Sequence, residues 1–207
     1  MNYDAIHGAG HRSGGCEMDP HANTCVAESN CIVLEYTGRS ADLVAYSPDY
    51  PSKQIPIATV ATTYDCPTSG ATYVLIINEV LYFGDSLSFS LISPNQLRDN
   101  DVHVDERHRQ HAPESLFGFL VPSESLRIPF TLEDVVTGFD TRPLTQDELG
   151  DTAMHVELTS DVEWIPHALC AQSLVEEDAV NSDDEEERDY KLASEALEGS
   201  TFQGNET

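Results

Sequence analysis

The feature that most constrains the fold is a pair of β-rich runs joined by a compact turn. Residues 55–64 are rich in Ile, Val and Thr, and residues 71–80 are rich in Tyr, Val, Leu and Ile. Between them, residues 66–70 read Cys-Pro-Thr-Ser-Gly, a composition that turns favour. The pattern predicts a β-hairpin, in which Pro56 indicates a strand start or an edge strand.

Short β-rich segments recur along the rest of the chain, with almost no amphipathic helix. They are residues 32–36, 102–104, 117–121, 125–130 and 155–158. Thr37-Gly38 is expected to close the first of them. Pro94 favours a short helical turn over residues 93–98, and a capping box at residues 145–148 predicts a second short helix. This spacing predicts an all-β fold, closed or sandwich-like.

Charge narrows the possible partners. The chain has 37 acidic and 10 basic residues, for a formal net charge of -27. Such a surface repels phosphate backbones and anionic membranes, which argues against nucleic acid and membrane partners. No apolar run is long enough to span a bilayer, and the first residues lack a signal-peptide pattern. We therefore expect a cytoplasmic protein whose five cysteines stay reduced.

Composition divides the chain into three parts. Residues 1–15 are rich in Gly and His and predict a flexible N-terminal arm. Residues 16–166 predict one folded domain. Residues 167–207 contain the acidic run 183–187, which repels itself and predicts a disordered tail.

One turn before the first strong strand contains an aspartate followed by small residues. It reads Asp19-Pro20-His21-Ala22-Asn23-Thr24. Further along, Ser90-Leu91-Ile92-Ser93-Pro94-Asn95-Gln96-Leu97-Arg98 forms a second distinctive segment. Four more distinctive segments lie at residues 33–38, 67–75, 139–143 and 158–164, and the order of all six along the chain also matters. Together they resemble the aspartic-protease part of copia-type retrotransposon polyproteins, over about residues 16–166.

The resemblance implies a retropepsin-like closed β barrel with one short helix. It implies an aspartic-type endopeptidase that acts on a peptide or polyprotein substrate without metal or cofactor. Asp19 is the implied catalytic residue, and Ala22 and Asn23 are the implied substrate-binding residues. Since the chain has one such loop, two carboxylates require a homodimer with Asp19 from each copy. The hairpin of residues 55–80 is the implied flap over the substrate.

The loop departs from the family pattern in ways that leave a second reading open. Pro20 replaces a hydroxyl residue that braces the two loops of the dimer, and proline also lacks a backbone N–H. Asn23 replaces a frequent aspartate, and Asp101 replaces a glycine. The alternative hypothesis is a catalytically inactive, protease-like interaction module. A third is a decayed fragment that does not fold cooperatively.

Three histidines lie close enough in the sequence to suggest a metal site. His103, His108 and His111 lie within one polar stretch, which would suit a metal site by residue type alone. The charged residues interspersed at 105–109 are typical of an exposed loop instead. We therefore predict no metal site there.

Overall fold

The computed structural model of the protein describes residues 15–43, 52–150 and 153–166. Most of the predicted N-terminal arm, residues 1–14, lies outside these ranges, as does the whole predicted acidic tail, residues 167–207. The ranges that are described contain most of the predicted domain.

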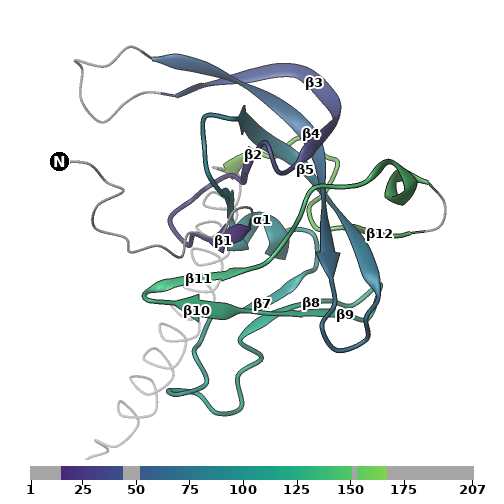
Figure 1. Ribbon diagram of the computed structural model, residues 1–207. Coiled ribbons are helices and arrows are strands. Elements are labelled where there is room, and N and C mark those ends of the chain that lie inside the picture. Colours follow the sequence, from purple (N-terminus) through teal and green to yellow (C-terminus); the bar gives the residue numbers. More distant parts are fainter. Residues whose placement is uncertain (1–14, 44–51, 151–152, 167–207) are drawn as a thin grey trace, which may run out of the picture. The chain divides into compact units, whose positions relative to one another are not determined.

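The described residues form two β-sheets (Figure 1). The main path of the larger sheet runs in the order β10 (Thr131–Glu133), β11 (Val136–Phe139), β1 (Cys16–Met18), β6 (Ser90–Ile92), β2 (Val26–Glu28), β5 (Thr72–Gly84), β4 (Lys53–Asp65), β3 (Ile32–Leu43). Its ninth strand, β12 (Met154–Glu157), pairs with β5 in parallel. The smaller sheet has the order β7 (His103–Asp105), β8 (Gly118–Val121), β9 (Leu126–Pro129).

The predicted all-β class is confirmed. The sheet order has two ends, β10 and β3, so the described residues do not form the expected closed barrel. Within the described ranges, the helical elements are α1 (Pro94–Arg98) and a 3-10 helix (Gln146–Leu149), both at predicted positions. No helix in the described ranges is both long and apolar enough to cross a bilayer.

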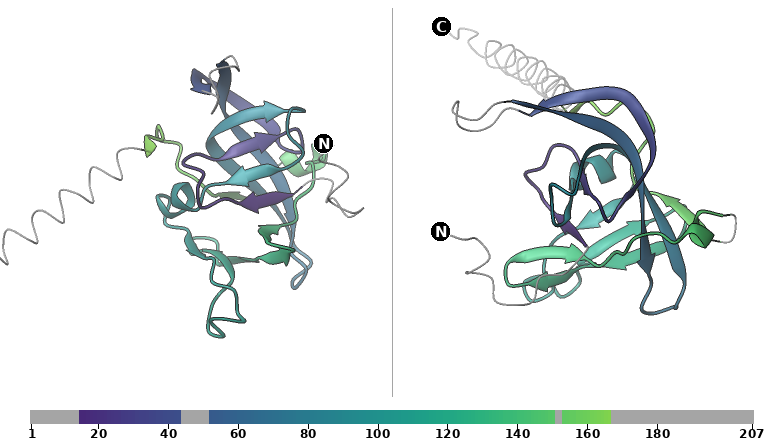
Figure 2. Two further views of the ribbon diagram at one scale, coloured as in Figure 1. Left: turned by 90° about the vertical axis from the view of Figure 1, so that its left-hand side faces the viewer. Right: turned by 45° about the horizontal axis from the view of Figure 1, so that its top comes forward.

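The predicted hairpin is present as β4 and β5, which are longer than the sequence pattern indicated. Their antiparallel register runs from Ile57 opposite Leu81 to Asp65 opposite Thr72. Cys66 N donates to Ala71 O over 2.8 Å and so closes the turn between the strands. The two strands curve together across the molecule, as Figure 2 shows.

Strand β3 differs from the prediction, because it does not end at Thr37-Gly38. Gly38 has φ +77°, which a residue without a Cβ adopts readily, and the pairing register with β4 shifts between Tyr36 and Ser40. The Thr37 hydroxyl donates to Ile57 O over 3.0 Å across the two strands. The glycine therefore marks a bulge, and the strand continues to Leu43.

An aromatic cluster joins the small sheet to the large one. Phe119 on β8 and Phe139 on β11 are both almost fully buried, with ring centroids 5.3 Å apart in an edge-to-face arrangement. Phe130 packs 6.0 Å from Phe119. Because β11 pairs directly with β1, this cluster supports the strand that leads into Asp19.

An ion-pair network ties the β4–β5 turn to the 3-10 helix. Arg142 donates to Glu148 Oε1 and to Asp65 Oδ2, each over 2.6 Å. The hydrogen bond from Arg142 lowers the pKa of Glu148 from 4.5 to about 2. Because the pKa of Glu148 is lower in the folded state than in the unfolded state, its ionised carboxylate stabilises the fold at pH values above the unfolded-state pKa. This contribution to stability is lost as the pH falls towards 2. The network is therefore intact at pH 5.

Candidate functional site

Asp19 stands directly after a strand that is held on both sides. β1 pairs with β6 in parallel and with β11 in antiparallel orientation. Asp19 N donates to Ile92 O over 3.0 Å, which extends the β1–β6 ladder by one bond. Met18 is buried, whereas the Asp19 side chain is 36% exposed. The sheet thus fixes the backbone and presents the carboxylate at the surface.

The loop after Asp19 is a tight turn that orients this carboxylate. Ala22 N donates to Asp19 O over 3.1 Å, and His21 N donates to Asp19 Oδ1 over 2.9 Å. Pro20 occupies the second position of the turn, where its fixed φ is favourable and no N–H is needed. The departure at Pro20 therefore leaves the turn itself intact. The His21 ring is 98% exposed, with Nδ1 3.9 Å from Asp19 Oδ1.

Two buried polar residues brace the loop from beneath. The Ser93 hydroxyl donates to Ala22 O over 2.8 Å. The Gln96 side chain accepts from Cys25 N over 2.8 Å and donates to Asn78 O over 3.1 Å. Ser93 and Gln96 are almost fully buried, so breaking these bonds would leave unsatisfied polar groups. The Ser90–Arg98 segment, which the sequence marks only through its resemblance to a family segment, thus holds the loop in place.

Burial keeps the nearby cysteines protonated. It raises the pKa of the Cys25 thiol to about 12 and that of the Cys31 thiol to about 11. Cys25 Sγ accepts from Ser93 N over 3.3 Å. Within the described ranges Cys16, Cys25, Cys31 and Cys66 are free thiols. The buried Cys25 and Cys31 thiols are therefore packing groups and not nucleophiles.

A C-terminal segment contacts the loop from the other side. Trp164 Nε1 donates to Asn23 O over 2.7 Å, and Trp164 N donates to Glu79 Oε2 over 3.2 Å. Glu79 is almost fully buried and pairs with Arg39 of β3, which also contacts Glu163 over 3.2 Å. These contacts link the loop, β5, β3 and residues 163–164. Nothing in the sequence around Trp164 indicates this contact with Asn23, because the two residues are far apart along the chain.

The predicted substrate-binding residues lie in the loop, where their carbonyls already have intramolecular donors. Ala22 O accepts from Ser93, and Asn23 O accepts from Trp164. Asn23 is exposed and Ala22 is half-buried, so Asn23 offers the larger surface to an external peptide. The role of Ala22 and Asn23 in substrate binding stays a prediction.

The turn of the hairpin predicted as a flap lies at the end of the strands that is far from the Asp19 loop. Leu81 N donates to Cys25 O over 3.0 Å, so this part of β5 lies beside the loop. Thr72, next to the turn, is nine residues away along β5, or about 30 Å at the usual strand rise. The outer halves of β3 and β4, by contrast, extend past Ile57 on the side of the loop. We call this extension, residues 39–43 and 53–56, the β3–β4 arm.

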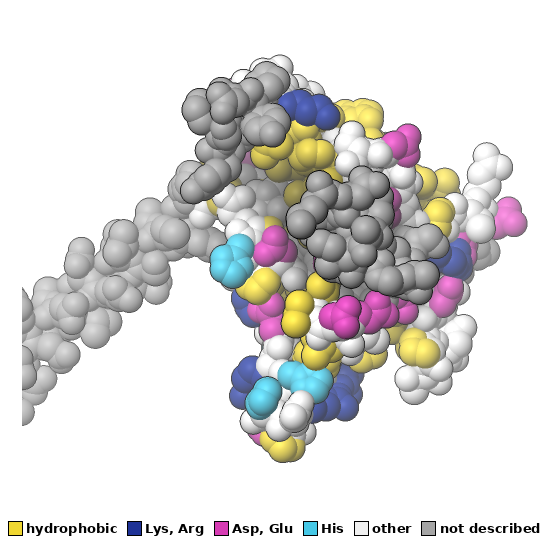
Figure 3. Space-filling model, turned by 60° about the vertical axis from the view of Figure 1, so that its left-hand side comes forward, with side chains coloured by type: hydrophobic (Ala, Val, Ile, Leu, Met, Phe, Trp, Pro, Cys, Tyr) yellow, Lys and Arg dark blue, Asp and Glu magenta, His cyan; other side chains and the backbone are white. Residues whose placement is uncertain are grey.

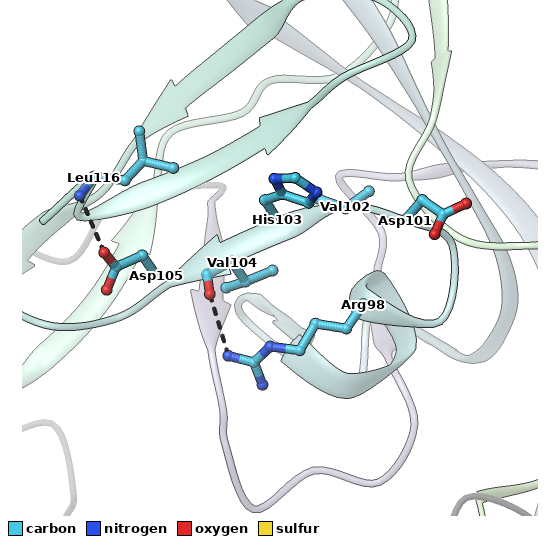
Figure 4. Close-up of a pocket in the computed structure, with 7 residues that line it drawn as sticks. All are labelled: Arg98, Asp101, Val102, His103, Val104, Asp105 and Leu116. Carbon is cyan, nitrogen blue, oxygen red and sulfur yellow. Dashed lines mark hydrogen bonds between the residues drawn. The ribbon is translucent and has the colours of Figure 1, made fainter.

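The histidine segment comprises β7 and the loop that follows it. His103 lines a pocket beside α1, shown in Figure 4, whose wall consists of Arg98, Asp101, Val102, His103, Val104, Asp105 and Leu116. The His108 ring packs edge-on against Phe117 with centroids 4.8 Å apart. Among the described residues, no group of three or more His, Cys, Asp or Glu side chains is arranged to hold a metal ion.

Comparisons with family models, with curated proteins and with solved structures found no match to this chain.

Replacing Trp164 by Phe is expected to loosen the loop, because an aromatic side chain is kept while the donor to Asn23 O is lost. The free energy of unfolding should fall by about 0.5–1.5 kcal/mol, measured by urea denaturation with circular dichroism. Amide hydrogen exchange should become faster at residues 21–25. Val162→Ala, at a 69% exposed position of the same segment, serves as the control. Unchanged exchange in the loop would contradict the positioning role of Trp164.

Proposed function

We propose that the chain is a retropepsin-like aspartic endopeptidase of retrotransposon origin, acting as a homodimer in the cytoplasm. The observation that carries the proposal is the presentation of Asp19. Its backbone is fixed by β6, its Oδ1 is held by His21 N, and its side chain is open to solvent. The ordered run of resembling segments supports the same assignment.

The proposed chemistry uses two Asp19 carboxylates that share one proton. Two like charges at such short range do not both ionise, so the pair titrates as a unit. The ionised carboxylate accepts a proton from water, whose oxygen attacks the scissile carbonyl carbon. The neutral carboxyl donates its proton to the carbonyl oxygen. When the tetrahedral intermediate collapses, the carboxyl that took the proton from water passes it to the leaving nitrogen, a hydroxyl of the intermediate returns a proton to the other carboxylate, and the C–N bond breaks.

The β3–β4 arm is the proposed cover over the bound peptide, in place of the β4–β5 hairpin. Arg39 at its base pairs with Glu79, which also accepts from Trp164 N. An extended peptide between the arm and the loop would find backbone groups of β3, the outermost strand in the sheet order.

The test of the proposal is cleavage of a mixed peptide library at about pH 5, where a shared-proton pair is expected to work. Sedimentation velocity on the same sample measures the dimer. Specific cleavage that rises with the dimer fraction supports the endopeptidase. A folded dimer that cleaves nothing between pH 3 and 7 would favour the alternative, an inactive protease-like interaction module, which Pro20 and Asn23 motivate.

Replacing Pro20 by Ser is expected to strengthen the dimer. The new hydroxyl can donate across the two loops, and one such bond is worth about 0.5–1.5 kcal/mol, or up to roughly tenfold in the dimer dissociation constant. Pro20→Ala is the matched control, since it restores the N–H without a hydroxyl. Equal dissociation constants for the two variants in sedimentation equilibrium would show that the hydroxyl forms no bridge.

A further inference from the structure

Basic side chains are concentrated around the loop that joins β7 to β8. In a chain with 10 basic and 37 acidic residues, the segment 98–127 contains three histidines and the arginines Arg98, Arg107, Arg109 and Arg127. Figure 3 shows Lys, Arg and His side chains gathered at the lower end of the molecule, where Figure 1 draws this loop. The loop and its surroundings therefore hold a large share of the chain's few positive charges.

Two of these arginines have no carboxylate partner among the described residues. They are Arg109 in the loop and Arg127 on β9, and both side chains are exposed. The other two are ion-paired, Arg98 with Glu106 over 3.2 Å and Arg107 with Asp105 over 2.9 Å. Although carboxylates greatly outnumber cations in the chain, the charges of Arg109 and Arg127 are not neutralised within its described part.

The two guanidinium groups meet at one backbone oxygen. Arg109 Nη2 donates to Leu116 O over 3.1 Å, and Arg127 Nη2 donates to the same oxygen over 2.9 Å. Arg109 Nε also donates to Ser115 O over 3.3 Å. A neutral carbonyl does not cancel two full charges, so the neighbouring guanidiniums repel each other. Because a guanidinium has five N–H donors, each of them keeps donors for an acceptor from outside.

The fold holds the backbone oxygen on which the two arginines converge. Leu116 N donates to Asp105 Oδ2 over 3.1 Å, a bond that Figure 4 draws. The hydroxyl of the buried Ser115 donates to Arg107 O over 2.6 Å. Arg127 itself belongs to the β8–β9 ladder. Loop and strand thus position the guanidiniums before a partner binds, which lowers the entropic cost of binding.

The chemistry of the pair selects the kind of partner. The planar fork of a guanidinium matches a carboxylate, whose two oxygens accept parallel N–H bonds. A long polyanion such as a nucleic acid would extend past the loop and meet the repulsion of a chain with a net charge of -27. A short acidic peptide can contact the loop and β9 alone.

We propose that Arg109 and Arg127 form a docking site for an acidic peptide segment of another protein, in which a Glu or Asp carboxylate bridges the two guanidiniums. No step of the proposed peptide cleavage is needed for this contact. Because the chain as a whole repels anions, an acidic peptide that binds it must find local positive charge.

The test uses a fluorescein-labelled hexaglutamate peptide and the full chain, with binding followed by fluorescence anisotropy at low ionic strength. We expect saturable binding to the native chain. Arg109→Gln and Arg127→Gln should each raise the dissociation constant roughly tenfold or more, because each removes charge-assisted hydrogen bonds. Arg127→Lys keeps the charge without the fork and should also bind more weakly. Lys53→Gln, which removes an exposed charge on β4, is the matched control and should bind normally.

The melting temperatures of the variants should match that of the native chain, because both arginine side chains are exposed. If a variant melts early, backbone amide NMR shifts of the native chain locate the peptide instead, with the largest changes expected at Arg109, Leu116 and Arg127. Largest changes elsewhere would contradict the site.

Two other results would overturn the proposal. One is a folded native chain that does not bind hexaglutamate, or whose binding both Gln variants retain. The other is displacement of the peptide by inorganic phosphate at a much lower concentration than by acetate, which would assign the site to phosphate groups and not to an acidic peptide.

Discussion

Asp19→Asn is expected to reduce peptide cleavage at pH 5 by roughly 10²- to 10⁴-fold or more, the usual contribution of a positioned acid or base. An amide can neither accept the proton from water nor donate one to the scissile carbonyl. The fold should be unaffected, because the amide oxygen of Asn can still accept from His21 N, as Asp19 Oδ1 does over 2.9 Å. Loss of activity would then be chemical and not structural.

The measurement is the initial cleavage rate of the native chain and the variant at equal dimer concentration. Asp85→Asn, at an exposed turn, is the matched control and should cleave normally. Mixing native chains with an excess of Asp19→Asn chains should suppress cleavage, because mixed dimers contain one carboxylate. Cleavage by Asp19→Asn at the native rate would remove Asp19 from the mechanism and with it the endopeptidase proposal.

Phe119→Ala is expected to cost about 3–5 kcal/mol of folding free energy, the range for truncating a buried aromatic ring. Phe119 is fully buried and contacts both Phe130 and Phe139. The cavity would open between the small sheet and β11, the strand that supports β1. Denaturation with guanidinium, followed by circular dichroism, measures the loss.

A matched truncation outside the core tests whether the loss of folding free energy comes from the burial of the ring and not from its aromatic character. Tyr36 is 55% exposed, so Tyr36→Ala should cost much less than Phe119→Ala. Phe119→Leu should fall between them, because most of the volume is kept. A loss below 1 kcal/mol for Phe119→Ala would mean that the aromatic cluster does not hold the two sheets together.

The sequence predicts those parts of the fold that local patterns determine. The β4–β5 hairpin follows from two β-rich runs and a turn of five residues, and α1 follows from Pro94. The end of β3 was predicted wrongly at Gly38, because a glycine bulge and a strand end look alike in sequence. The open order of the larger sheet is set by pairings between distant segments, which no local pattern indicates.

The candidate site also has one part that local sequence predicts and another that depends on distant residues. Asp19 was found because a family resemblance marks it, and its turn is a local structure. Its supports depend on residues far along the chain, namely Gln96 beneath the loop and Trp164 beside it. The hairpin proposed as a flap was placed wrongly for a related reason. The position of a turn relative to the site depends on how β5 pairs with β2, which is parallel and long-range.

These pairings also have a consequence for how the protein reaches its folded state. β1 pairs with β6 and β11, so the strand before Asp19 gains its neighbours only after residues 92 and 139 have been synthesised. Non-local parallel pairings slow folding, because distant segments must meet before their contacts stabilise the chain. The β4–β5 hairpin can form early during translation, whereas the Asp19 loop is completed last, when Trp164 has left the ribosome. A nascent or truncated chain would therefore have β structure well before it has a site.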